Sequence, residues 1–303
     1  MFPLYIKNKI PDLLTHLSKL YSIQKSSATS NDEITSVEVS YEVFDNFASP
    51  LIVMHGLLGS KNNWLAKCKQ YSKKTKPPRQ IIAIDSRNHG KSPHTNIHTY
   101  EHIVADMKAL FDRISLTKVA LLGHSMGGRS CMLYSLKYPE LVEKLIVADI
   151  SPITGLHMAE FAKIFDILLA AQIPSGVPVS KAVKMMDNDL TPKIASSRLR
   201  NFLLSNIVKK QDGSNGWRVN LTVLAKDLKH LCVFPLDDTM RYEGPTLFVA
   251  GGNSNFVPKS DLPKILKYFP KAELTYIKGA THWLHLDKPQ EFMDITVEFL
   301  NRS

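Results

Sequence analysis

A serine flanked by glycines follows an apolar run near the middle of the chain. Residues 118–130 read KVALLGHSMGGRS, so Ser125 lies between Gly123 and Gly127 in a Gly-x-Ser-x-Gly pattern. The apolar run predicts a buried strand and the following segment a helix, and a serine in such a tight strand-to-helix turn is typical of a nucleophile. The turn leaves no room for a bulky Cβ two positions before or after the serine. The alternative is a glycine-rich turn with a purely structural role.

A nucleophilic serine needs a base and a group that orients the base. The segment YIKGATHWLHLDKP near the carboxyl end supplies His282 and His285. His282 lies three residues after Gly279, in a loop that precedes a helix, and this is the expected place of the base. We therefore predict His282 as the base, with His285 as the alternative. His124 adjoins the serine but points elsewhere by the geometry of the turn.

The orienting carboxylate has two candidates. The loop after the predicted strand PTLFVAGG reads GGNSNF and has no carboxylate before Asp261. Asp149 ends the strand KLIVAD, which should lie beside the strand of Ser125, and a charge at the end of a buried strand is costly unless it is paired. We predict Asp149 as the acid and keep Asp261 as the alternative. Ser254 is expected to hydrogen-bond the Asp–His pair.

Two backbone amides would complete such a site by binding an oxyanion. Met126 follows the nucleophile directly, and Leu57 lies in the loop MHGLLGS after an earlier strand. We predict that these two N–H groups form the oxyanion hole. His55 is expected to shape the same loop, and Asp85 to fix the turn after its own strand.

Strand-like and helix-like segments alternate along most of the chain. Short Val-, Ile- and Leu-rich runs are expected as buried strands at 50–56, 80–86, 118–124, 143–150, 245–252 and 272–279. With helical periods between them, this alternation predicts an α/β fold with a mostly parallel sheet flanked by helices. Residues 153–242 show helical periodicity and no clear strand, and are too long for a simple connection. The predicted parts are a leader (1–35), a core (36–152), an inserted helical cap (153–242) and the rest of the core (243–303).

Composition narrows the class of protein. The 303 residues carry 38 Lys and Arg against 28 Asp and Glu, a net charge of +10, and 44% are apolar. The chain has no zinc-finger spacing, no aromatic RNA-binding motif and no long basic run, so small molecules rather than nucleic acid are the expected partners. Three scattered cysteines predict neither disulfides nor a metal site. No apolar run is long enough to span a membrane.

The first thirty residues have the composition of a targeting segment. They contain four Lys, five Ser and one acidic residue, Asp12, and LLTHLSKLYSI could form an amphipathic helix. This resembles a mitochondrial transit peptide, although it lacks Arg. We predict a mitochondrial protein; a surface arm on a cytoplasmic protein is the alternative.

Several motifs taken together carry a family resemblance. HGLLGSKNNW, DSRNHGKSPH, GHSMGGRS, YPELVEKLIVADISP, GGNSNFVP and THWLHLDKPQEF occur in order over residues 36–303. They resemble one branch of the α/β-hydrolase superfamily, which holds small bacterial esterases, a mitochondrial hydrolase of animals and the yeast ethanol acetyltransferases. The resemblance implies a Ser–Asp–His triad with its acid at Asp149.

The resemblance to the yeast members also implies an activity. It implies acetyl transfer from acetyl-CoA to ethanol, giving ethyl acetate, and thioesterase or esterase activity when water is the acceptor. Acetyl-CoA would be a substrate, and no cofactor or metal is expected. The alternatives are a plain carboxylesterase or lipid ester hydrolase and, in another class, a non-catalytic binding protein. Cations of the cap could meet CoA phosphates, although a solvated cationic face explains them as well; these are Lys181, Lys184, Arg198 and Arg200.

Overall fold

The six apolar runs and an edge strand at 41–44 form one seven-stranded sheet in the computed structural model, which describes residues 33–45, 47, 49–153 and 158–302. The strands are β1 Tyr41–Phe44, β2 Ser49–Met54, β3 Arg79–Ile84, β4 Val119–His124, β5 Val142–Ala148, β8 Thr246–Gly251 and β9 Ala272–Ile277. Their order is β1-β3-β2-β4-β5-β8-β9. Only β1 runs antiparallel to its neighbour; the other pairings are parallel. The predicted α/β fold with a mostly parallel sheet is confirmed.

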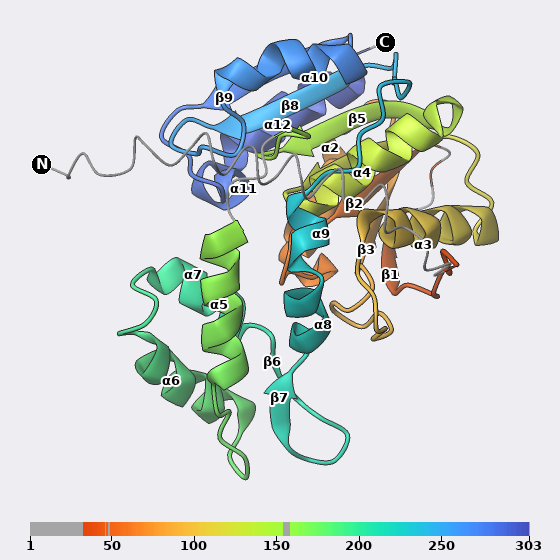
Figure 1. Ribbon diagram of the computed structural model, residues 1–303. Helices are drawn as coiled ribbons and strands as arrows, with labels where there is room; N and C mark the ends of the chain where they lie inside the picture. The colour runs from red at the N-terminus through yellow and green to blue at the C-terminus, as the bar shows by residue number, and fades with distance from the viewer. Residues whose placement is uncertain (1–32, 46, 48, 154–157, 303) are drawn as a thin grey trace, which may run out of the picture. The chain divides into compact units, whose positions relative to one another are not determined.

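Helices cover both faces of this sheet (Figure 1). Helices α2 Leu65–Lys74 and α12 Pro289–Asn301 contribute to the apolar layer on one face. Helices α3 Tyr100–Arg113, α4 Met126–Lys137 and α10 Leu262–Tyr268 contribute to the layer on the other. Every residue of β4 is buried between the two layers, as a continuous apolar run requires. Short turns complete the core: η1 Lys61–Asn63, η2 Pro139–Leu141, η3 Lys259–Asp261 and α11 Leu284–Asp287.

The side chains of Thr99 and Asp287 form hydrogen bonds near helix ends, and only that of Thr99 caps a helix. Thr99 caps α3, because its side chain accepts a hydrogen bond from the backbone N–H of His102. Asp287 ends α11 and does not cap α12, and its carboxylate accepts hydrogen bonds from the N–H and the hydroxyl of Thr281.

The segment between β5 and β8 forms a second group of elements, which we call the cap. It contains α5 Met158–Ala170, α6 Val179–Leu190, α7 Ser197–Leu204, α8 Leu221–Lys226 and α9 Leu228–Cys232. It also contains a hairpin of β6 Ile207–Lys209 and β7 Asn215–Trp217, so the expectation that this segment holds no strand is wrong. The Asp212-Gly213 pair at the hairpin turn, with φ +82° at Gly213, is the signal that would have found it. The cap has its own apolar core.

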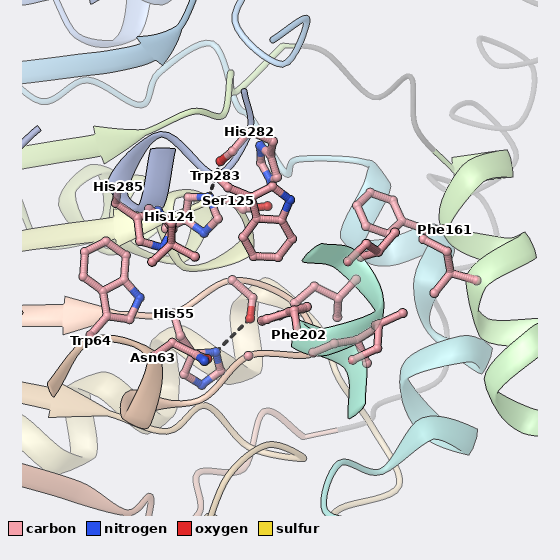
Figure 2. Close-up of a pocket in the computed structure, with 18 residues that line it drawn as sticks. His55, Asn63, Trp64, His124, Ser125, Phe161, Phe202, His282, Trp283 and His285 are labelled. Carbon is pink, nitrogen blue, oxygen red and sulfur yellow. Dashed lines mark hydrogen bonds between the residues drawn. The ribbon is translucent and has the colours of Figure 1, made fainter. Parts of the chain in front are cut away.

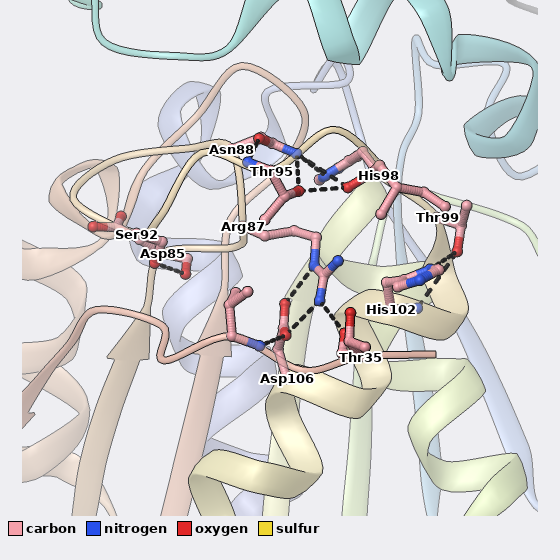
Figure 3. Close-up of polar contacts among 12 residues, drawn as sticks. Thr35, Asp85, Arg87, Asn88, Ser92, Thr95, His98, Thr99, His102 and Asp106 are labelled. Atoms are coloured by element: carbon pink, nitrogen blue, oxygen red, sulfur yellow. Dashed lines mark hydrogen bonds and ion pairs between the residues drawn. The ribbon is translucent and has the colours of Figure 1, made fainter. Parts of the chain in front are cut away.

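The loop after β3 is tied to α3 by a buried ion pair (Figure 3). Arg87 donates from Nε and Nη2 to the two oxygens of Asp106 at 2.7 and 2.6 Å, and both side chains are almost fully buried. Arg87 also donates to the carbonyl of Thr35, and Asp106 accepts the N–H of Val37. This pair therefore joins the loop, the helix and the segment before β1.

The predicted leader over 1–35 lies almost wholly outside the described residues. Within the described part of the chain, no helix has the length and apolar character needed to span a membrane.

Candidate active site

Ser125 occupies a strained turn between β4 and α4. Its backbone has φ +54° and ψ −121°, which a residue with a side chain adopts rarely. The turn requires its glycines: a Cβ on Gly123 would lie 2.2 Å from the carbonyl oxygen of Gly127, and a Cβ on Gly127 would lie 2.5 Å from that of His55. The serine thus lies at the carboxyl end of a central strand and at the N-terminus of a helix, whose dipole favours negative charge.

Asp149 and His282 meet directly although 133 positions separate them. Nδ1 of His282 lies 2.8 Å from Oδ2 of Asp149. The carboxylate is fully buried and also accepts hydrogen bonds from Ser254 Oγ at 2.5 Å and from the N–H of Gly251 at 2.8 Å. Asp149 directly follows β5, which pairs with β4, so the sheet order brings it beside the serine turn. Three donors compensate the cost of burying this charge.

The ring of His282 is held from several sides. Phe256 stacks on it with ring centroids 4.0 Å apart and an interplanar angle of 21°. The backbone carbonyl of His282 accepts a hydrogen bond from Nε2 of His124 at 2.9 Å. Because Nδ1 faces Asp149, Nε2 is the nitrogen left for Ser125, and both residues line one pocket (Figure 2). Sequence reasoning missed Phe256, which no motif marks beyond its place in the GGNSNF loop.

The alternative base lies in a different environment. His285 is buried and stacks on Trp64 with ring centroids 4.5 Å apart. Burial and the neighbouring His124 hold the pKa of His285 well below its usual value. Its Nδ1 has no hydrogen-bond partner among the described residues, so no carboxylate orients the ring through this nitrogen. Burial likewise lowers the pKa of His124 to about 3.

The alternative acid is engaged elsewhere. Asp261 ends η3, and its Oδ2 accepts a hydrogen bond from the hydroxyl of Ser151 at 2.6 Å. The structure therefore brings Asp149, and not Asp261, to His282.

The N–H of Leu57 and the carbonyl of Gly56 belong to one peptide group. The contacts of that carbonyl therefore indicate where the N–H points. The Gly56 oxygen accepts hydrogen bonds from the N–H of Gly59 at 2.9 Å and from Nδ1 of His55 at 2.8 Å. Nε2 of His55 accepts the N–H of Ser86, so the proton of this ring is on Nδ1. Because a trans peptide points its N–H opposite to its C=O, the Leu57 N–H is directed away from these partners.

The predicted role of Asp85 at the turn after β3 agrees with its contacts. Its carboxylate accepts hydrogen bonds from the N–H groups of Lys61 and Lys91 and pairs with the Lys61 ammonium at 2.5 Å. It thus joins the loops that follow β2 and β3.

The pocket at Ser125 is apolar and lies between the core and the cap. Cap residues Phe161 and Phe202 line it together with Trp283 (Figure 2). Leu286 of α11 also lines it. In the described part of the chain, its lining contains histidines and Asn63 but no Lys, Arg, Asp or Glu. Such a site favours an uncharged, apolar ligand.

The four cap cations considered for CoA phosphates do not line this pocket. Arg200 is buried and pairs with Asp187, and Arg198 pairs with Asp287. Lys181 and Lys184 are exposed on α6.

Comparison with known proteins agrees with this geometry. A family model described as alpha/beta hydrolase fold matches residues 49–289. The sn-1-specific diacylglycerol lipase ABHD11 of Danio rerio is 36% identical over 296 residues, covering 97% of this chain and 92% of that protein. A probable alcohol acetyltransferase of Saccharomyces cerevisiae is 31% identical over 268 residues, 84% of this chain and 77% of that protein.

A solved structure is also similar to most of this chain. A marine microorganism esterase has a TM-score of 0.80 at 33% identity, covering 87% of this chain and 99% of its own. Since the family model spans most of the chain and the relatives match along nearly all of it, the chain belongs to the alpha/beta hydrolase fold family.

Proposed function

We propose that this protein is a serine esterase that forms an acyl-enzyme on Ser125. The observation that carries the proposal is the 2.8 Å contact between His282 and the buried Asp149, beside a serine in a strained turn that opens into an apolar pocket. In this proposal Nε2 of His282 takes the proton of Ser125 as its oxygen attacks the ester carbonyl. Asp149 holds the ring in the required tautomer and stabilises the imidazolium.

The proposed reaction then passes through an oxyanion. The N–H groups of Leu57 and Met126 bind the negative oxygen of the tetrahedral intermediate. His282 returns its proton to the leaving alcohol as the carbon–oxygen bond breaks. Water, deprotonated by His282, attacks the acyl-enzyme and releases the acid and free Ser125.

We propose esters of neutral, apolar acids as the substrate class. The absence of charged residues from the pocket lining, within the described chain, argues against an anionic group bound inside it. Two of the similar proteins, a diacylglycerol lipase and an esterase, act on the same class of substrate by their names.

Alcohol acetylation is the second candidate. Its support is the 31% identity to a probable alcohol acetyltransferase, together with an apolar pocket that would limit water and favour an alcohol as acceptor. Acetyl-CoA would then be the donor, with its charged nucleotide outside the pocket.

Two assays on purified protein test these proposals. We expect the protein to hydrolyse p-nitrophenyl butyrate and react with a fluorophosphonate, and Ser125→Ala to lose both reactions. Incubation with acetyl-CoA, with and without ethanol, then separates the candidates, because only the acetyltransferase gives ethyl acetate. A folded protein that binds acyl esters without turnover would instead be a binding protein.

A further inference from the structure

Leu57 lies in the turn of residues 56–59, which we call the oxyanion turn. One residue of this turn has an unfavourable backbone conformation. The N–H of Gly59 donates to the carbonyl of Gly56 at 2.9 Å and closes it. Leu58, its third residue, has φ +61°. Glycine or asparagine is usual at a turn position with positive φ, and a leucine there persists only where surrounding contacts hold it.

Contacts from the cap supply much of this support. Nδ2 of Asn206, between α7 and β6, donates to the carbonyl of Leu58 at 2.7 Å, and Asn206 is only 2% exposed. The side chain of Leu58 is buried in the apolar core of the cap, in the same cluster as Leu203 and Leu224. The N–H of Leu58 donates to Nε2 of His89 in the core domain. Two of these three attachments therefore come from the cap.

The orientation of the Asn206 amide is itself determined by its neighbours. Its Oδ1 accepts a hydrogen bond from Nη2 of Arg218 at 3.3 Å, and its backbone carbonyl accepts the N–H of Arg218 at 2.7 Å. A guanidinium can only donate and a carbonyl can only accept, so Oδ1 must face Arg218 and Nδ2 must face Leu58. Asn206 is thus a donor already directed at the oxyanion turn.

We infer that Asn206 is a positioning residue for the oxyanion hole. By holding Leu58 in its left-handed conformation, the cap presents the N–H of the preceding Leu57 to the substrate carbonyl. The inference rests on the proposed function, because it assigns Asn206 to the oxyanion step of that reaction. If Asn206 has this role, the oxyanion hole is complete only when the cap packs on the core.

The test is the kinetics of Asn206→Asp with p-nitrophenyl butyrate. The aspartate keeps the shape and can still accept from Arg218, but it has no N–H for Leu58. Loss of one oxyanion donor costs about 10²–10³-fold in kcat, and a displaced donor should cost less, so we expect kcat to fall about tenfold or more. KM should change by less than about twofold, because the interaction acts in the transition state.

A second measurement separates positioning from general damage. A trifluoromethyl ketone adds to the serine and places an oxyanion in the hole, so its inhibition constant should rise by the same factor as kcat falls. Asn206→Ala removes the same donor without adding charge and keeps the test decisive should the aspartate variant fail to fold.

Asn215→Asp is the matched control. Asn215 is also buried in the cap, and its Nδ2 donates to the carbonyls of Pro174 and Val177, within the cap. We expect this variant to keep the wild-type kcat. An equal loss in both variants would overturn the inference, as would a normal kcat or a rise in KM alone in the Asn206 variants. Turnover that survives in Ser125→Ala would overturn the proposed function itself.

Discussion

At the scale of the residue, the candidate site depends on where one carboxylate is placed. Asp149 directly follows a buried strand, and His282, Ser254 and the N–H of Gly251 compensate its buried negative charge. Ser254 stands in the loop after β8, where the sequence offers no carboxylate before Asp261. A hydroxyl in that loop therefore supports an acid that comes from the neighbouring strand, β5.

Replacing each carboxylate by its amide tests this placement. We expect Asp149→Asn to lower kcat about 10⁴-fold, because an amide no longer holds the imidazole tautomer that accepts the serine proton. Asp261→Asn should change kcat by less than about threefold, since its carboxylate binds Ser151. Steady-state kinetics with p-nitrophenyl butyrate gives both values. Loss of turnover in Asp261→Asn alone would contradict the assignment of Asp149.

At the scale of the element, a buried ion pair joins helix α3 to the loop after β3. The hydrophobic periodicity of α3 does not predict this contact. Asp106 of α3 is buried and paired with Arg87 (Figure 3). Asp112 of the same helix is exposed and pairs with Lys108 at i,i+4. Burial raises the pKa of Asp106 even though Arg87 opposes the change. Removing one member of a buried pair leaves an uncompensated charge, whereas an exposed pair contributes little.

The two aspartates of α3 therefore form a matched pair for stability. We expect Asp106→Ala to lower the free energy of unfolding by about 3–5 kcal/mol, because Arg87 stays buried without its partner. Asp112→Ala should change it by about 0.5 kcal/mol or less. Urea denaturation followed by circular dichroism measures both, and similar losses in the two variants would contradict the role given to burial.

At the scale of the whole molecule, several histidines are buried in their neutral form. Burial lowers the pKa of each of His55, His89, His98, His124 and His285. His89 and His124 have pKa values of about 3 and are almost fully buried. Nε2 of His89 accepts the N–H of Leu58, so protonation would remove this hydrogen bond.

The lowered pKa values of these histidines predict how the free energy of unfolding depends on pH. Below about pH 6.5 the unfolded chain binds protons that the folded chain does not, so their contribution is present above that pH and is lost as pH falls towards 3. At pH 5, His89 and His124 should each lower the free energy of unfolding by about 2 kcal/mol relative to pH 7.

Urea midpoints at a series of pH values measure this slope. His124→Gln should flatten it, because the variant lacks one of the buried imidazoles. Stability that stays constant from pH 7 to pH 5 would contradict the prediction.

The sequence by itself determined the strands, the α/β class and the strand-to-helix turn around Ser125. These features have local causes: apolar runs for strands buried on both faces, and glycines where a Cβ would meet backbone at about 2.2–2.5 Å. It missed the β6–β7 hairpin, whose strands are only three residues long and lack a sustained alternation.

The tertiary structure decided which distant side chains meet. Asp149 and Asp261 were both plausible acids, and only the pairing of β5 with β4 and with β8 brings Asp149 to His282. The contact of Asn206 with Leu58 spans 148 positions and has no local signature. Such contacts depend on the order of the strands in the sheet and on how the cap packs on it. The hydrophobic periodicity of a single segment determines neither.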